Sequence, residues 1–127
     1  MLSQDAKILV VDDALIMREA LRRVLASLGY NNVLQAEHGK GALNVLEKNQ
    51  YQVGIVFLDI VMPFMDGKAA LKKIREKSKT LPVVMLSSVT DQEAIDECVK
   101  EGIVTYLLKP VNAVNGPALL TEIFKKL

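Results

Sequence analysis

Side chains that could do chemistry follow four separate apolar runs in this sequence. They are Asp12 with Asp13, Asp59, Ser87 with Ser88, and Lys109. Three carboxylates close together repel one another and raise one another's pKa unless a cation intervenes. Mg²⁺ prefers oxygen ligands and commonly takes one or two carboxylates together with phosphate oxygens. With a lysine and a hydroxyl nearby, the set is typical of a phosphoryl-transfer site, where catalysis rests on positioning and charge neutralisation.

Asp59 is the candidate nucleophile of such a site. It ends the continuous apolar run 54–58, and Pro63 with the pair Asp66-Gly67 then predicts a loop. An unpaired buried carboxylate is costly, so this side chain must either reach solvent or have partners. A carboxylate can itself attack phosphorus and form an acyl phosphate.

The pattern of the whole chain indicates how these groups are positioned. Short continuous apolar runs predict strands buried on both faces at 8–11, 54–58 and 83–86, and two further strands are expected at 32–36 and 103–108. Between and after them, helical spacing predicts helices at 16–28, 39–46, 68–77, from a capping box at Thr90 and Glu93 to Gly102, and from Gly116-Pro117 onward. Strand and helix alternate five times, which predicts a parallel sheet with helices on both faces. Ligands bind such sheets beyond the carboxyl ends of the strands, so we expect the polar groups to converge at that edge.

Composition narrows the class of protein. The 127 residues are enough for one domain, expected to span 1–127, with 50% apolar and 24% charged residues. A net charge of +1 offers no broad basic surface, so we expect no direct contact with nucleic acid. No apolar run approaches the ~20 residues of a membrane span, and the start of the chain lacks a signal pattern, so no membrane insertion is expected. The single cysteine, Cys98, fits a reducing cytoplasm.

The polar groups, taken with their order and spacing, resemble the receiver domain of bacterial two-component response regulators over essentially the whole chain. The motifs are the acidic pair Asp12-Asp13, Asp59 before the loop 62–67, Ser87, and Lys109-Pro110. Each motif alone is weak, but all four in order are highly specific. The resemblance implies a single-domain, flavodoxin-like α/β fold: a doubly wound, five-stranded parallel sheet in the order 2-1-3-4-5 with five helices.

The resemblance also implies a role for each residue of the site. Asp59 would accept the phosphoryl group from a phosphohistidine on a sensor histidine kinase. Mg²⁺ would be held by Asp13, Asp59 and the backbone carbonyl of Val61, with Asp12 acting through bound water, and Lys109 would pair with a phosphoryl oxygen. The protein would then be a phosphoacceptor that assists its own phosphorylation and slow dephosphorylation, not an enzyme.

A switch is implied as well. Ser87 would move to hydrogen-bond the phosphoryl group, and Tyr106 would turn inward when it does. The Lys109-Pro110 peptide bond is expected to be cis. The surface formed by the fourth helix, fifth strand and fifth helix would then bind the downstream partner.

Five stretches are similar to chemotaxis regulators of the CheY type: Met17-Arg18, 28–33, Ala42-Leu43-Asn44, the entry to Gly54 and the tail 123–127. That subgroup makes the flagellar motor switch one candidate partner. Val111, where the family usually has phenylalanine, and Gly116-Pro117 depart from the pattern near the expected output surface, which leaves the identity of the partner open.

Other interpretations remain. The chain could be a receiver excised from a longer regulator or hybrid kinase, or a domain that binds partners without phosphorylation. A phosphatase with an aspartyl nucleophile would carry a second aspartate two residues later, where this chain has Val61. Among single residues, Asp12-Asp13 could simply cap a helix, Tyr106 could be plain packing, and Asp66 could be a turn residue. We expect His38 in a surface loop and Cys98 in the core.

Overall fold

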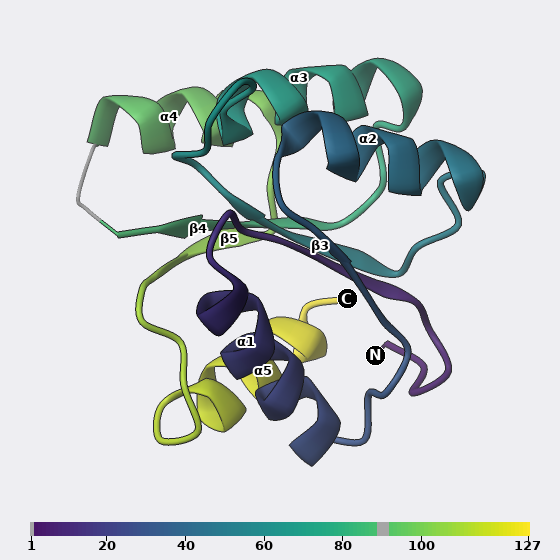
Figure 1. Cartoon of the computed structure of the whole chain (residues 1–127), viewed down its shortest axis with the longest axis vertical. Helices are drawn as coiled ribbons and strands as arrows, with labels where there is room; N and C mark the ends of the chain where they lie inside the picture. Colours follow the sequence, from purple (N-terminus) through teal and green to yellow (C-terminus); the bar gives the residue numbers. More distant parts are fainter. Residues whose placement is uncertain (1, 89–91) are drawn as a thin grey trace.

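The structure, a computed structural model, describes residues 2–88 and 92–127. Within these residues, strands and helices alternate along the chain (Figure 1). The strands are β1 (Ile8–Val11), β2 (Val33–Ala36), β3 (Ile55–Asp59), β4 (Val83–Ser87) and β5 (Thr105–Leu108). The helices are α1 (Leu15–Ser27), α2 (Gly39–Lys48), α3 (Gly67–Lys77), α4 (Gln92–Glu101) and α5 (Gly116–Lys125). All strand pairs are parallel, in the order β2-β1-β3-β4-β5, so the expected α/β fold and strand order are confirmed.

The sheet is covered on both faces. Helices α2, α3 and α4 lie on one face, and α1 and α5 lie on the other (Figure 1). Alternate side chains of one strand enter the two cores: Leu9 and Val11 pack under α2 and α3, whereas Ile8 and Val10 pack toward α1 and α5. Burial on both faces explains why β1, β3 and β4 have continuous apolar sequences instead of alternating ones.

Strand β5 is shorter than the expected strand 103–108 and lies at the edge of the sheet. It begins at Thr105 instead of Ile103, and Tyr106 and Leu108 are 40% and 50% exposed. The reason is its place in the sheet, because an edge strand has a neighbour on one side only. The edge therefore presents an aromatic and an aliphatic side chain to solvent.

The helix boundaries follow the expected signals closely. Gly29 ends α1 with a positive φ of 93°, and Pro117 lies in the first turn of α5. The expected capping box of α4 includes Thr90, which lies outside the described residues. The helical spacing of apolar residues predicts buried positions for Ile16 and Val99, but these side chains are 77% and 56% exposed.

In the described part of the chain, every helix is too short or too polar to cross a lipid bilayer.

Candidate functional site

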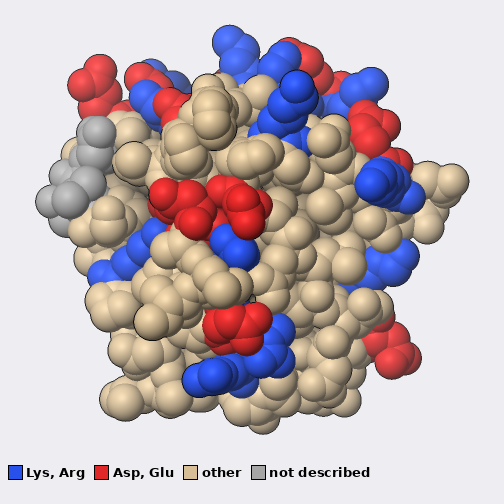
Figure 2. Space-filling view, viewed as in Figure 1, with Lys and Arg blue, Asp and Glu red and all other residues tan. Residues whose placement is uncertain are grey.

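The order of the strands reverses between β1 and β3, which pair directly at the centre of the sheet. Asp12 and Asp13 follow β1, Asp59 is the last residue of β3, Ser87 the last of β4, and Lys109 follows β5. These carboxyl ends lie at one edge, where open α/β sheets bind ligands. The space-filling view shows acidic atoms gathered between the two helical layers, with basic atoms beside them (Figure 2). The expected convergence of the polar groups is confirmed.

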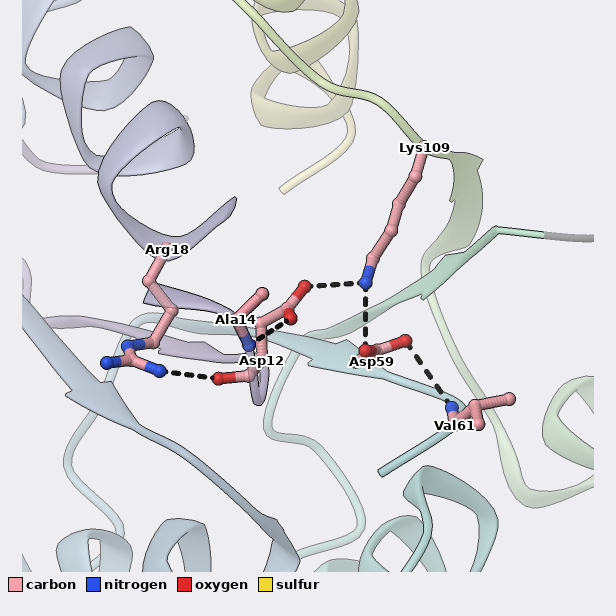
Figure 3. A network of polar contacts seen from close by, with 6 residues as sticks. All are labelled: Asp12, Ala14, Arg18, Asp59, Val61 and Lys109. Atoms are coloured by element: carbon pink, nitrogen blue, oxygen red, sulfur yellow. Dashed lines mark hydrogen bonds and ion pairs between the residues drawn. The ribbon is translucent and has the colours of Figure 1, made fainter. Parts of the chain in front are cut away.

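The Lys109 ammonium bridges two buried carboxylates. Its Nζ lies 2.6 Å from Asp12 Oδ2 and donates a hydrogen bond of 2.8 Å to Asp59 Oδ2 (Figure 3). Asp12 is 1% exposed and Asp59 is 3% exposed. At this depth an ion pair is screened far less than at the surface, so these three groups behave as one electrostatic unit.

Burial and pairing act in opposite directions on this unit. Burial raises the pKa of Asp59, and the hydrogen bond and charge of Lys109 offset this rise only in part. The neighbouring charge of Asp12 raises the pKa of Asp59 further. Burial lowers the pKa of Lys109, but its contacts with Asp12 and Asp59 outweigh that effect and leave the pKa above its ordinary value. The site therefore holds more negative charge than a single ammonium neutralises.

The donor set fits a hard divalent cation. One carboxylate oxygen each from Asp12, Asp13 and Asp59 lies within 4.8 Å of the other two. Asp13 is exposed to solvent. Oδ2 of Asp12 is buried, and within the described residues its contact is the ion pair with the Lys109 ammonium. Oxygen donors around a partly solvated position match what Mg²⁺ requires, since this ion keeps several of its waters.

The loop after β3 shapes the surroundings of Asp59. The Val61 amide donates to Asp59 Oδ1 at 3.4 Å, and the Gly67 amide donates to the Ile60 carbonyl at 2.7 Å. A Cβ on Gly67 would overlap the Asp59 carbonyl oxygen and lie 2.8 Å from the Ile60 Cα, so only glycine allows this close return. Asp66 does more than make a turn, because its carboxylate caps α3 by accepting from the Ala69 amide at 2.9 Å.

Ser87 and Tyr106 lie on the two strands beyond Asp59. Ser87 is 3% exposed, and its carbonyl accepts from the Lys109 amide at 2.7 Å, which ties the end of β4 to Lys109. Tyr106 pairs in register with Met85 and keeps its ring partly in solvent. The Lys109-Pro110 peptide bond is cis, as expected. The movements expected of Ser87 and Tyr106 stay a prediction.

Sequence reasoning assigned no part in the site to Arg18. Arg18 is 7% exposed, and its guanidinium donates from Nη1 to the Asp12 carbonyl at 2.8 Å (Figure 3). A signal was present in the sequence: Arg18 lies three residues before Leu21 and seven before Leu25, on the buried stripe of α1.

His38 and Cys98 lie outside the acidic cluster. His38 is half-buried and caps α2, because its Nδ1 accepts from the Gly41 amide at 3.0 Å, so it is more than a surface loop residue. Its ring also meets the Phe64 ring edge-on. Cys98 is in the core as expected, and burial raises the pKa of its thiol to about 11.

Comparison with known proteins agrees with this geometry. Residues 8–121 match the family model of the response regulator receiver domain. The chain is 38% identical over 128 residues to chemotaxis protein CheY-3 of Vibrio cholerae, covering 99% of this chain and 97% of that protein. It is 36% identical over 106 residues to the chemotaxis protein CheY homolog of Campylobacter jejuni, covering 82% of this chain and 81% of that protein.

A solved structure shows the same fold. The CheX-CheY-BeF3-Mg²⁺ complex from Borrelia burgdorferi contains a chain that matches with a TM-score of 0.85 and 28% identity, over 95% of this chain and 87% of that one. The part of the chain that matches the family model, residues 8–121, contains the whole candidate site, from Asp12 to Lys109. The chain therefore belongs to the response regulator receiver family.

Proposed function

We propose that this chain is a phosphorylation-dependent signalling receiver in which Asp59 accepts the phosphoryl group. The observation that carries the proposal is the ammonium of Lys109 held between the buried carboxylates of Asp59 and Asp12. A lysine at this point offers a fixed positive charge to an incoming phosphoryl oxygen. Receiver domains are in general signalling proteins and not enzymes, and the proposed role agrees with that.

The transfer step is a displacement at phosphorus. A carboxylate oxygen of Asp59 attacks the phosphorus of a kinase phosphohistidine, the phosphorus–nitrogen bond breaks, and an acyl phosphate forms on Asp59. Lys109 moves its ammonium from the carboxylates to a phosphoryl oxygen. Asp13, Asp59 and the Val61 carbonyl would hold Mg²⁺, with Asp12 acting through a bound water. The bound ion would neutralise charge on the phosphoryl oxygens.

The output step would use the edge of the sheet. Phosphorylation adds nearly two negative charges beside Ser87 and Lys109 and biases an equilibrium between two arrangements of Ser87 and Tyr106. Tyr106, Leu108 and Val99 are already exposed on β5 and α4, so a change in the tyrosine ring would alter an apolar surface directly. A downstream protein would bind this surface of α4, β5 and α5.

A role in chemotaxis is supported by the match to CheY-3 over nearly its whole length. Within that role, a sensor histidine kinase would supply the phosphoryl group, and the flagellar motor switch is one candidate for the downstream partner. The phosphatase alternative is not favoured, since Val61 occupies the position where such enzymes carry their acidic residue.

Incubation with acetyl phosphate and Mg²⁺ tests the proposal. Intact-mass spectrometry should show the addition of one phosphoryl group to the wild-type protein and none to Asp59→Asn. An unmodified wild-type protein, in a reaction where another receiver is modified, would refute Asp59 as the acceptor. A pull-down from cell extract with and without beryllofluoride then shows whether partner binding follows the modification.

A further inference from the structure

Arg18 is a buried cation on α1 that has no close acidic partner within residues 2–88 and 92–127. Its nearest carboxylate oxygen in an ion pair, on Glu37, is 3.9 Å away, and the Glu37 side chain is 72% exposed. Such a pair contributes little, because solvent screens it. Arginine is rarely buried unless it is paired, and desolvating its charge is costly. The cost must therefore be offset by the other contacts that the guanidinium makes.

Those contacts join three parts of the fold. Nη1 of Arg18 donates to the Asp12 carbonyl at 2.8 Å (Figure 3). Its Nε donates to Gln35 Oε1 on the edge strand β2 at 2.9 Å. Gln35 in turn donates from Nε2 to Glu19 Oε1 at 3.2 Å, which fixes the orientation of the Gln35 amide. The Arg18 guanidinium, carried by α1, thus hydrogen-bonds both to β2 through Gln35 and to Asp12, the residue that follows β1.

The backbone that Arg18 holds is that of the acidic pair. Asp12 is fixed at four points: its amide donates to the Ala36 carbonyl at 3.2 Å, its Oδ1 accepts from the Ala14 amide at 2.9 Å, its Oδ2 pairs with Lys109, and its carbonyl accepts from Arg18. Asp13 is exposed and lies one peptide bond further on. The direction of the Asp13 carboxylate therefore depends on the Asp12–Asp13 peptide group, whose oxygen accepts the hydrogen bond from Arg18.

We propose that Arg18 is a positioning residue for the divalent cation: it fixes the Asp12–Asp13 peptide so that both carboxylates face Asp59 before the ion arrives. The inference rests on the proposed function for the identity of that ion, Mg²⁺. A loop that is already ordered loses less conformational freedom on binding. Groups that orient metal ligands without touching the metal typically change its affinity about 10- to 100-fold when removed.

Arg75 provides a matched control for a purely structural effect. Its guanidinium also donates to backbone carbonyls, those of Ser78, Leu81 and Gly102. These carbonyls lie at the opposite edge of the sheet, before β4 and after α4. Removing either arginine destabilises the fold by breaking several hydrogen bonds, but only Arg18 touches the acidic loop.

The test compares Arg18→Met with Arg75→Met by isothermal titration of Mg²⁺ into each purified protein. Mg²⁺ should bind Arg18→Met about tenfold more weakly than wild type, the lower end of the range for such groups. Arg75→Met should lose thermal stability and keep wild-type affinity. In acetyl phosphate reactions, the Mg²⁺ concentration for half-maximal rate should rise for Arg18→Met, while the rate at saturating Mg²⁺ changes little.

A second variant covers the case in which Arg18→Met does not fold. Gln35→Leu removes the brace on Nε and leaves the bond from Arg18 to Asp12 available, so Mg²⁺ affinity should fall in the same direction by a smaller factor. Wild-type affinity in a folded Arg18→Met protein, or in Gln35→Leu if the first variant is unfolded, overturns the inference. So does an equal loss in Arg75→Met. A wild-type protein that binds no Mg²⁺ overturns the metal site of the proposed function as well.

Discussion

Lys109 and Asp12 lie 2.6 Å apart at their charged atoms, although strands β3 and β4 separate the two strands that carry them. The lysine side chain spans this distance along the carboxyl edge of the sheet and contacts Asp59 on the way. One ammonium is therefore shared by two buried carboxylates that belong to neighbouring central strands. A change in any member of this unit alters the electrostatic balance of the other two.

Replacement of Lys109 by methionine should destabilise the metal-free protein by about 3 kcal/mol, because it leaves buried carboxylates without their cation. Urea unfolding in EDTA measures this loss. Mg²⁺ should recover more stability in the variant than in wild type, since the ion then supplies the missing charge. The exposed Lys73→Met on α3 is the control and should change stability by less than about 0.5 kcal/mol. Equal stability of Lys109→Met and wild type would mean that the bridge contributes nothing.

Asp59→Asn should raise the stability of the metal-free protein at neutral pH by about 1 kcal/mol, within the usual size of single-residue effects. Burial raises the pKa of Asp59 above the ordinary 3.8, so the folded protein binds this proton more tightly than the unfolded chain. Stability is therefore lost as pH rises from the ordinary pKa through the raised one. Lys109 keeps Asp12 as a partner in the variant.

The pH dependence of stability tests whether the pKa of Asp59 is raised or lowered in the folded protein. Urea unfolding of both proteins at pH 7 and at about pH 4, near the ordinary carboxyl pKa, should show the advantage of Asp59→Asn shrinking at the lower pH. An advantage that grows as the pH falls would show that the pKa of Asp59 is lowered in the folded protein.

Asp13→Asn should weaken Mg²⁺ binding by at least about tenfold, because affinity in such sites follows the number of charged oxygen ligands. Asp13 is exposed, so the free energy of unfolding in EDTA should stay within about 0.5 kcal/mol of wild type. Calorimetric titration and urea unfolding measure the two quantities. The control is Asp5→Asn, an exposed aspartate before β1 at the other edge of the sheet, which should bind Mg²⁺ as wild type does. A similar loss in both variants would indicate a general charge effect.

Gly67→Ala should destabilise the protein by about 2 kcal/mol, the usual cost of forcing a group into a packed site. The new methyl would overlap the Asp59 carbonyl oxygen and displace the end of β3, which carries Asp59. Phosphorylation by acetyl phosphate should slow as well, since Asp59 would be displaced. In Gly41→Ala on α2 the new methyl would meet the His38 ring at 3.3 Å and the Ala36 Cβ at 3.6 Å, and stability should change by less than about 1 kcal/mol. Normal phosphorylation of a destabilised Gly67→Ala would show that Asp59 tolerates the shift.

A tryptophan at position 106 would report the proposed switch, because the chain contains no other tryptophan. In Tyr106→Trp the ring should begin partly exposed, as the tyrosine is. Beryllofluoride with Mg²⁺ should shift its emission to shorter wavelength as the ring turns inward. The shift should disappear in Tyr106→Trp combined with Ser87→Ala. A spectrum that does not respond in Tyr106→Trp, under conditions where the ligand binds, would argue against coupling of this ring to the site.

Much of the fold follows from local patterns in the sequence. The continuous runs at β1, β3 and β4 identify buried strands because both faces of each strand enter a core. The edge strand β5 also belongs to a largely apolar run, 103–108, yet Tyr106 and Leu108 are exposed. Hydrophobicity alone does not reveal which strand lies at an edge, because that depends on how the strands are ordered.

The sequence by itself determined the alternation of strands and helices, the residues that end the strands, and hence which side chains reach the carboxyl edge. Tertiary structure alone decided that Lys109 spans two strands to reach Asp12, that Arg18 grips the Asp12 carbonyl, and that Tyr106 lies partly in solvent. The physical reason is the separation along the chain over which each kind of interaction acts. Strand and helix periodicity is set by steric and burial effects between near neighbours in the chain, which a sequence displays directly. Contacts between residues distant in sequence depend on packing, which settles strand order and side-chain reach only when the whole sheet has formed.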